Sequence, residues 1–234
     1  MPVVLCTVVD PALHGNYVRW MQHIAADVDV RFVTAVTEFD ALLPEADGLL
    51  LPGGGDPAPE LYGMPEAASF CAVEPGRDAL ELHAIEQAVR HSLPLLGICR
   101  GLQIATVAFG GSLIPDLPTA GFDGHHRLEG ADRIHELRID ADSLLADITG
   151  ERDLAVNSAH HQGVDRIPAR LRVSARSADG LPEALEWAQP AGKPFLLLVH
   201  WHPERLTFSH PASASLGAAF AHAVRRHAEA RNNT

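Results

Sequence analysis

The chain has 234 residues, of which 47% are hydrophobic and 21% are charged, a balance that excludes an intrinsically disordered protein. Its 18 Lys and Arg residues against 30 Asp and Glu residues give a net charge of −12, which argues against a surface that holds a nucleic-acid backbone. Three cysteines are too few for a disulfide framework, and the apolar stretches are shorter than the ~20 residues of a membrane helix. We therefore expect a single domain over residues 1–234 that is cytoplasmic and binds neither nucleic acid nor a membrane.

The first half of the chain alternates short apolar runs with segments of helical periodicity. This alternation predicts an α/β fold with a mostly parallel sheet, helices on both faces, and the carboxyl ends of the strands along one edge. The predicted strands are Val3–Val9, Val28–Thr34, Gly48–Leu51 and Pro94–Ile98. The predicted helices contain Tyr17–Ile24, Phe39–Leu43, Gly76–His91 and Gly101–Phe109.

The second half contains several strand-like runs with few helices between them. This pattern predicts an antiparallel segment that joins the same sheet. The predicted strands are Ile134–Ile139, Arg172–Ser177, Ala184–Ala188 and Phe195–Trp201. Leu216, Phe220 and Val224 indicate a closing helix, and we expect the polar end Ala228–Thr234 to be frayed.

The sharpest motif follows the strand Pro94–Ile98, where the chain reads Gly-Ile-Cys-Arg-Gly. A buried strand that enters a helix through Gly-X-Cys-X-Gly is typical of a nucleophile elbow, here with cysteine in place of serine. Cys99 would lie at a helix N-terminus, where the dipole and the free N–H groups favour a thiolate. The N–H of Arg100 would point toward a developing oxyanion. A buried cysteine that only fills a strand end is the alternative.

A candidate base lies in the segment His200–Glu204, which reads His-Trp-His-Pro-Glu and follows an apolar strand. A nucleophilic thiol needs a base, and the base needs a group that orients it. His202 and Glu204 supply both, and Pro203 stiffens the exit from the strand. For this segment alone, a surface His–Glu pair is the alternative.

Two further segments follow strands and carry chemistry. Pro52–Asp56 places three glycines after the strand Gly48–Leu51, and bare backbone N–H groups suit a second oxyanion donor. The segment lacks the Gly-Lys-Ser/Thr of a phosphate-binding loop, and a plain turn is its alternative. Val156–Gln162 concentrates polar residues that either line a pocket or form a polar loop.

In this order and spacing, these segments resemble the class I glutamine amidotransferase-like family, and most of all its branch of γ-glutamyl-γ-aminobutyrate hydrolases, peptidase family C26. The resemblance implies a flavodoxin-like class I glutamine amidotransferase fold over nearly the whole chain. The matching stretches are Leu49–Gly63, Pro94–Leu117, His135–Gly150, Val156–Gln162, Asp179–Glu186 and His200–Glu204.

The resemblance also implies roles for individual residues. Cys99 is the nucleophile, His202 is the general base and then the general acid, and Glu204 orients His202. The oxyanion hole comes from the N–H of Arg100 and of a glycine in Gly53–Gly55, with Gly54 favoured. The implied oxyanion and substrate-binding residues together are Gly54, Gly55, Arg100, Gln103, Ser158, His160 and His161.

Two departures from the family pattern stand out. The family strand usually reads Gly-Val-Gln-Trp-His-Pro-Glu, and here His200 replaces the Gln. In an extended strand His200 and His202 would face the same side, where His200 either perturbs the pKa of His202 or, as we favour, packs against the sheet. The connection Pro118–Arg133 lacks family residues, and its His125, His126 and Arg127 either cap the substrate or form a solvated loop.

We expect a cysteine hydrolase that cleaves the γ-glutamyl amide bond of γ-glutamyl-γ-aminobutyrate or a related γ-glutamyl amine through a thioester. A glutaminase subunit that delivers ammonia to a separate synthase is one alternative, and a catalytically silent binding protein is another. The glutamyl carboxylate needs a cation, for which Arg100, Arg127 and Arg205 are candidates. We expect no cofactor and no metal, because the pairs His125-His126 and His160-His161 lack a supporting Cys or carboxylate spacing. The sequence does not determine the oligomeric state, and a homodimer is one possibility.

Overall fold

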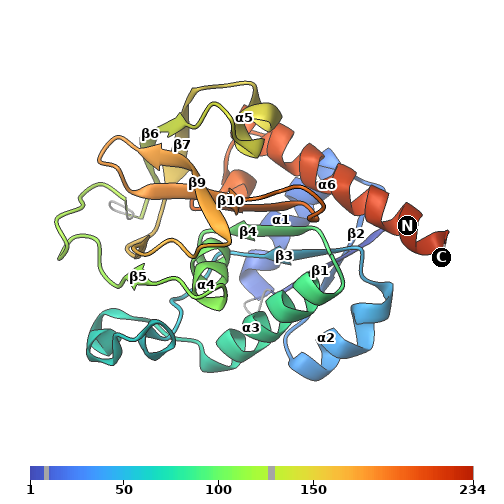
Figure 1. Cartoon of the computed structure of the whole chain (residues 1–234), viewed down its shortest axis with the longest axis horizontal. Coiled ribbons are helices and arrows are strands. Elements are labelled where there is room, and N and C mark those ends of the chain that lie inside the picture. The colour runs from blue at the N-terminus through green and yellow to red at the C-terminus, as the bar shows by residue number, and fades with distance from the viewer. Residues whose placement is uncertain (8–10, 126–129, 234) are drawn as a thin grey trace.

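The computed structural model describes residues 1–7, 11–125 and 130–233, and its centre is one large mixed sheet (Figure 1). Within the described residues the strand order is β2-β1-β3-β4-β11-β10-β9-β6-β7. The first five strands in this order are parallel to one another and the last four are antiparallel. The parallel strands are β2 (Asp29–Phe32), β1 (Val3–Cys6), β3 (Gly48–Leu51), β4 (Leu95–Ile98) and β11 (Leu196–Val199). The antiparallel strands are β10 (Pro182–Trp187), β9 (Leu171–Ser177), β6 (Arg133–Ile139) and β7 (Asp153–Ser158).

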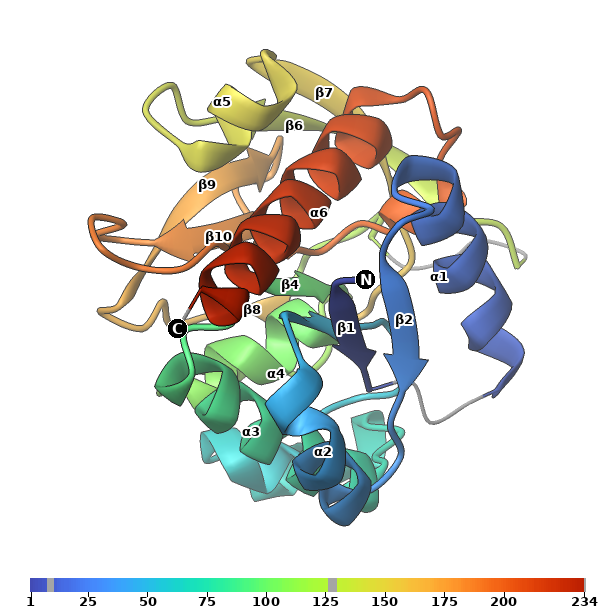
Figure 2. The same ribbon diagram turned by 90° about the vertical axis from the view of Figure 1, so that its right-hand side faces the viewer.

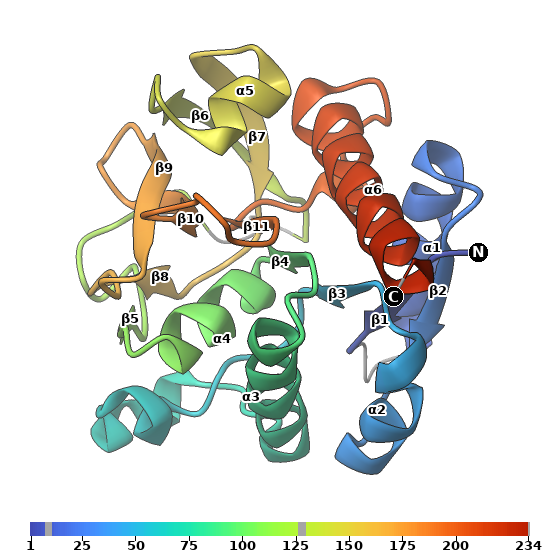
Figure 3. The ribbon, with the colours of Figure 1, turned by 45° about the vertical axis from the view of Figure 1, so that its right-hand side comes forward.

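Helices cover both faces of this sheet (Figures 2 and 3). One layer contains α1 (Pro11–Ile24), α5 (Leu144–Thr149) and α6 (Pro211–Asn232). The other layer contains α2 (Val36–Leu42), α3 (Pro75–Arg90) and α4 (Arg100–Ala108). The remaining elements are the short pair β5 (Leu113–Ile114) and β8 (Gly163–Val164) and the 3-10 turns η1 (Leu43–Glu45), η2 (Pro59–Tyr62), η3 (Pro65–Phe70) and η4 (Pro203–Arg205).

The central strands are apolar along their whole length because both of their faces are covered. In β3, Leu50 packs into the layer of α1 and α6, whereas Leu49 and Leu51 pack into the layer of α3 and α4. This two-sided burial explains why the strand has no alternation of apolar and polar residues. A hydrogen bond of 3.0 Å from Trp20 Nε1 to Ser213 Oγ joins α1 to α6 inside the first layer.

The predicted architecture is confirmed: a mostly parallel sheet is flanked by helices, and the antiparallel segment joins the same sheet. The first strand ends at Cys6 rather than Val9, and Val8 and Val9 lie outside the described residues. The prediction of a frayed end at Ala228–Thr234 is wrong up to Asn232, where α6 ends. The last turn is held because Arg231 pairs with the buried Asp47 through Nε and Nη2, at 3.0 and 3.1 Å.

Three neighbouring parallel strands determine where the candidate site forms. The order β3-β4-β11 places the carboxyl ends of these strands side by side. The glycine-rich loop follows Leu51, Cys99 follows Ile98, and the segment from His200 follows Val199. The fold therefore brings three of the four predicted motifs to one edge of the sheet, where α/β proteins bind ligands. Among the described helices, none combines the length and the apolar composition that a membrane-spanning segment requires.

We predict that Phe220→Ala lowers the free energy of unfolding by about 3–5 kcal/mol, because its ring is fully buried between α6 and the sheet and leaves a cavity when it is removed. Urea denaturation measures this loss. Phe70→Ala is the matched control, since that ring is 48% exposed, and it should change stability by less than about 0.5 kcal/mol. Equal losses in the two variants would contradict the assignment of Phe220 to the core.

Candidate active site

Cys99 forms the sharp turn between β4 and α4. Its backbone has φ 51° and ψ −104°, a positive φ that non-glycine residues rarely adopt and that costs on the order of 1–3 kcal/mol. The turn is held by hydrogen bonds on both sides: the Cys99 N–H donates to the Val199 carbonyl at 2.8 Å, and the Cys99 carbonyl accepts from Leu102 and Gln103 at 3.0 and 3.2 Å. The strained elbow predicted from the Gly-X-Cys-X-Gly sequence is therefore present.

The two glycines beside Cys99 are required by close packing. A β-carbon on Gly101 would lie 2.2 Å from the Leu51 carbonyl oxygen, and one on Gly97 would lie 2.7 Å from the Leu198 side chain. Both distances are too short for a real contact. The first turn of α4 thus packs directly on the backbone of β3, which places Cys99 beside the glycine-rich loop.

His202 and Glu204 form a buried pair at the end of β11. His202 Nδ1 lies 2.8 Å from Glu204 Oε1, and the two residues are only 2% and 6% exposed. Asn157 at the end of β7 holds the backbone of His202 from both sides: its Oδ1 accepts from the His202 N–H at 2.8 Å, and its Nδ2 donates to the His202 carbonyl at 3.0 Å. The imidazole is thus oriented by a carboxylate on a fixed backbone.

The surroundings of His202 favour its protonated form. Burial alone would lower the pKa of the imidazole, but the charges of Glu204 and of Cys99 and the hydrogen bonds to both outweigh it and raise this pKa to about 9. Cys99 follows β4, and β4 is the neighbour of β11, whose carboxyl end leads to His202. A thiol and an imidazole so arranged can exchange a proton as a thiolate–imidazolium pair.

The glycine-rich loop packs directly against His202. A β-carbon on Gly53 would lie 2.7 Å from His202 Cε1. The N–H of Gly53 donates to the Tyr17 hydroxyl at 2.8 Å, and the N–H of Gly55 donates to Glu74 Oε1 at 3.2 Å. Of these three glycines, Gly54 alone has an N–H without a partner among the described residues. It is therefore the N–H of this loop that is available to a ligand.

A network of buried arginine and carboxylate side chains holds this loop in place. Arg77 Nη2 donates to the carbonyls of Pro52 and Gly53, at 2.9 Å each, and its Nε pairs with Glu81 at 2.9 Å. Arg100 pairs with Asp78 and with the other oxygen of Glu81. The Arg100 side chain is fully buried and already paired with two carboxylates, so this one of the three candidate cations is not free to meet a substrate carboxylate. Its backbone N–H lies at the start of α4.

The other two arginine candidates differ in status. Arg205 already pairs with Asp132 at 3.1 Å and lies 3.5 Å from Glu204, with a side chain that is 22% exposed. Arg127 lies outside the described residues, as does His126.

The predicted substrate-binding residues separate into two groups. His161 borders the glycine-rich loop: its Nε2 lies 3.1 Å from both oxygens of Asp56, its Nδ1 lies 3.4 Å from Asp116, and its side chain is 32% exposed. Hydrogen bonds to Asp56, opposed by burial, raise the pKa of this imidazole. Gln103, Ser158 and His160 are instead buried, and all three contact a cluster of histidines next to the site.

His200 belongs to that cluster and not to the surroundings of His202. The strand β11 ends before either residue, and the two rings have different partners. His200 is fully buried, stacks on His160 with 3.5 Å between ring centroids, and contacts Gln103 Nε2 at 3.1 Å. The His200 ring therefore packs against neighbouring side chains, which is the role that we favoured for it from the sequence. His125 lies in the same cluster and is 2% exposed, which excludes a solvated position for it.

Several residues at this site carried no recognised sequence signal. Tyr17 occupied an ordinary position of a predicted helix, and Arg77 lay in the predicted helix Gly76–His91 without an assigned role. Asn157 stood inside the polar segment Val156–Gln162 without an assigned role. Each is identified only by its partner across the fold: Gly53 for Tyr17 and Arg77, and His202 for Asn157.

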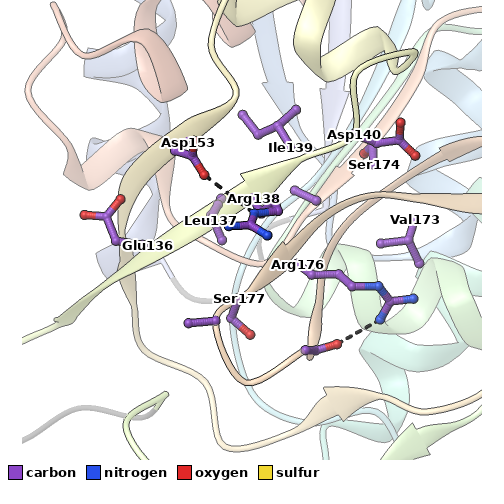
Figure 4. Close-up of a pocket in the computed structure, with 13 residues that line it drawn as sticks. Glu136, Leu137, Arg138, Ile139, Asp140, Asp153, Val173, Ser174, Arg176 and Ser177 are labelled. Carbon is purple, nitrogen blue, oxygen red and sulfur yellow. Dashed lines mark hydrogen bonds and ion pairs between the residues drawn. The ribbon is translucent and has the colours of Figure 1, made fainter.

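A large open cavity of about 640 Å³ lies elsewhere, over the antiparallel strands β6 and β9 (Figure 4). Arg138, paired with Asp153, and Arg176, bonded to the Gly180 carbonyl, line this groove. None of its lining residues belongs to the candidate site. Its size alone therefore does not make it the place of reaction.

Comparisons with known proteins find a matching family pattern, similar sequences and a shared fold. The sequence pattern of the family Peptidase C26 matches residues 10–204. The chain is 36% identical over 197 residues to the γ-glutamyl-γ-aminobutyrate hydrolase PuuD of Escherichia coli, covering 80% of this chain and 76% of that protein. It is 37% identical over 165 residues to the Mycobacterium tuberculosis protein Rv2859c, of which it spans only 52% of the length. The glutaminase domain of Trypanosoma brucei CTPS has the same fold, with a TM-score of 0.67 at 18% identity over 96% of this chain and 93% of that one.

We predict that Gly101→Ala destabilises the protein by about 1–3 kcal/mol, because the added methyl group pushes α4 away from the Leu51 carbonyl. Chemical denaturation followed by circular dichroism measures the loss. Gly76→Ala in α3 is the control: its β-carbon meets open space, and it should be neutral or stabilising by up to about 1 kcal/mol. Full stability of Gly101→Ala would show that the elbow is looser than its packing indicates.

Proposed function

The chain belongs to the Peptidase C26 family, and we propose that it hydrolyses the γ-glutamyl amide bond of γ-glutamyl-γ-aminobutyrate or a related γ-glutamyl amine. The observation that carries this proposal is the convergence of Cys99, His202 and Glu204 at one sheet edge. A thiol on a strained elbow lies beside an imidazole that a buried carboxylate orients. This is the constellation that acyl transfer through a thioester requires.

In the proposed reaction, the Cys99 thiolate attacks the side-chain carbonyl carbon of the γ-glutamyl group. The N–H groups of Gly54 and Arg100 stabilise the negative oxygen of the tetrahedral intermediate. The intermediate collapses, the C–N bond breaks, and the His202 imidazolium gives its proton to the leaving amine. A γ-glutamyl thioester remains on Cys99.

Water then completes the cycle. Neutral His202 takes a proton from the water, whose oxygen attacks the thioester carbonyl, and the C–S bond breaks to release glutamate and the thiolate. Glu204 keeps the ring in one orientation and stabilises its charged form in both half-reactions. His161 contacts Asp56 and Asp116 beside the glycine-rich loop, and we expect it to contact the substrate from this side.

A first experiment measures glutamate release by the purified protein from γ-glutamyl-γ-aminobutyrate and from glutamine in parallel. We expect fast release from the first substrate and little from the second, and complete loss in a folded Cys99→Ala variant, because Cys99 is the proposed nucleophile that forms the thioester. His202→Asn should lose at least about 100-fold, the scale of a lost general acid–base. Release from glutamine alone would favour the glutaminase-subunit alternative, and release from neither would favour a silent binding protein.

The pH dependence of kcat/KM tests the roles of His202 and Glu204. A raised pKa means that the imidazolium persists at neutral pH and is lost as pH rises through about 9, so kcat/KM should fall above that pH. In Glu204→Gln the carboxylate charge is gone, and the basic limb should shift to lower pH together with a lower rate. The exposed His222→Gln on α6 is the control and should keep the native profile. An unshifted limb in Glu204→Gln would remove Glu204 from the proposed triad.

A further inference from the structure

Four imidazole rings surround one buried carboxylate beside the candidate active site. The carboxylate belongs to Glu183 on β10, which is fully buried. His125 Nδ1 and His160 Nε2 face its Oε1 at 3.4 and 3.5 Å, and His135 Nε2 and His200 Nδ1 face its Oε2 at 3.7 and 4.0 Å. Five side chains from distant parts of the chain thus converge on one point, and the proposed amide hydrolysis uses none of their charges.

These distances are too long for hydrogen bonds, which lie between about 2.7 and 3.2 Å for N–H···O. They suit ligands that share a metal ion. With bonds of about 2.0–2.2 Å from a metal to nitrogen and oxygen, two ligands of one ion lie about 3.4 Å apart at a tetrahedral angle and further apart at wider angles. The ligand atoms fall into two triads that share the carboxylate, and all atoms of a triad lie within 4.8 Å of one another: His125, His135 and Glu183, and His160, His200 and Glu183.

The inward-facing atoms also lack other partners. Both oxygens of Glu183 and the four nitrogens that face them are buried without a hydrogen bond among the described residues. A buried carboxylate without hydrogen bonds is costly, and so is each buried imidazole nitrogen. A cation held by either triad would satisfy the inward-facing atoms of that triad.

The outer nitrogens of three rings are anchored in the manner of metal-binding histidines. Such histidines donate their second ring N–H to a carboxylate or a carbonyl, which leaves the first nitrogen free to ligate. His125 Nε2 lies 2.8 Å from Asp179 Oδ2, and His160 Nδ1 lies 2.9 Å from the Gln162 carbonyl. His200 Nε2 lies 3.1 Å from the amide end of Gln103, which can accept from it when the amide is turned to present its oxygen.

We propose that Glu183 and the histidines 125, 135, 160 and 200 form a binding site for a divalent transition-metal ion. Imidazole and carboxylate donors without thiolate suit Zn²⁺, Fe²⁺, Co²⁺ or Ni²⁺ and disfavour Mg²⁺ and Ca²⁺, which prefer oxygen. The near-parallel stacking of His160 and His200, with 17° between ring planes, opposes simultaneous protonation of both rings and is compatible with neutral ligands. The sequence predicted no metal because no Cys or carboxylate lies at ligand spacing from the histidine pairs along the chain. Glu183 is distant in the sequence and reaches the histidines only in the folded structure, from β10.

The bound ion would act as a clamp on the candidate active site. The triad of His125, His135 and Glu183 would join β6 and β10 to the loop that carries His125. The triad of His160, His200 and Glu183 would join β10 to the end of β11 and to the loop that carries His160. Ser158 Oγ already donates to the His125 carbonyl, and His200 lies two residues before His202. An open cavity of about 550 Å³, lined by His125, His135 and Asp179 among others, gives an ion a route from solvent.

The test measures metal binding in the untagged full chain that carries Cys99→Ala, so that the nucleophile cannot supply a ligand. Elemental analysis after purification without chelators should find at least one transition-metal ion per chain, and two ions would mean that the two triads bind separately. Zn²⁺ affinity is measured by competition with a chromophoric chelator, and Co²⁺ substitution should give visible d–d bands of nitrogen coordination.

Three variants on this background decide between a metal site and a metal-free ion-pair cluster. Glu183→Gln should lower the Zn²⁺ affinity by at least about 100-fold, more than loss of an outer-shell partner does, and abolish the Co²⁺ bands. His135→Gln should also weaken binding by about 100-fold, and its partly exposed side chain keeps the test valid if Glu183→Gln does not fold. His222→Gln, exposed on α6, controls for surface histidines and should bind as the parent does.

No stoichiometric metal in the parent, or equal Zn²⁺ affinity in His135→Gln and His222→Gln, would overturn the proposal and leave an ion-pair cluster. The readouts do not involve amide hydrolysis. A failure of the proposed enzymatic function therefore leaves this test unaffected.

Discussion

The close approach of α4 to β3 and β11 is the constraint on which the site depends. The backbone can turn at Cys99 only in a conformation with positive φ, and that conformation persists because the Cys99 N–H is bonded to β11 while Gly101 lies against the Leu51 carbonyl. The strain is offset by the apolar burial of the strands on either side. A looser helix would relieve the turn, but it would also separate the thiol from the loop after β3 and from the imidazole after β11.

Buried charged residues hold the glycine-rich loop after β3 in place on the other side of the site. Three glycines in succession would otherwise be a mobile loop, since glycine loses more backbone entropy on ordering than any other residue. Here Arg77 bonds two of the loop carbonyls and is itself held by Glu81, which also binds Arg100 at the start of α4. Loop and elbow thus share one carboxylate, so the N–H of Gly54 and the N–H of Arg100 are held in a fixed relation. Oxyanion stabilisation needs donors that do not reorganise during the reaction.

The local sequence was sufficient to predict a structural feature where neighbouring residues cause that feature. The strand Gly48–Leu51 has the bounds predicted for it, because an apolar run stops at Pro-Gly-Gly-Gly, and the elbow follows from glycines next to Cys99. It was insufficient where the cause is a distant partner. The last turn of α6 depends on Asp47, 184 positions before Arg231, and the clamp on His202 comes from Asn157, 45 positions away. The histidine cluster shows the same limit, since pairs of neighbouring histidines say nothing about a glutamate on another strand.

Two of the buried carboxylates near this edge, Glu204 and Glu183, differ in how many imidazoles each one faces. Glu204 faces His202 at hydrogen-bond distance, so protonation of His202 gives one neutral ion pair. The negative charge of Glu204 raises the pKa of the imidazole. Glu183 faces four rings, all beyond hydrogen-bond distance. A single negative charge can balance one imidazolium, and further protons on the stacked rings would repel one another. In our proposal, a divalent cation in a triad therefore satisfies the inward nitrogens of these rings better than protons do. In our two proposals, the same residue types thus serve proton transfer in one place and metal binding in the other.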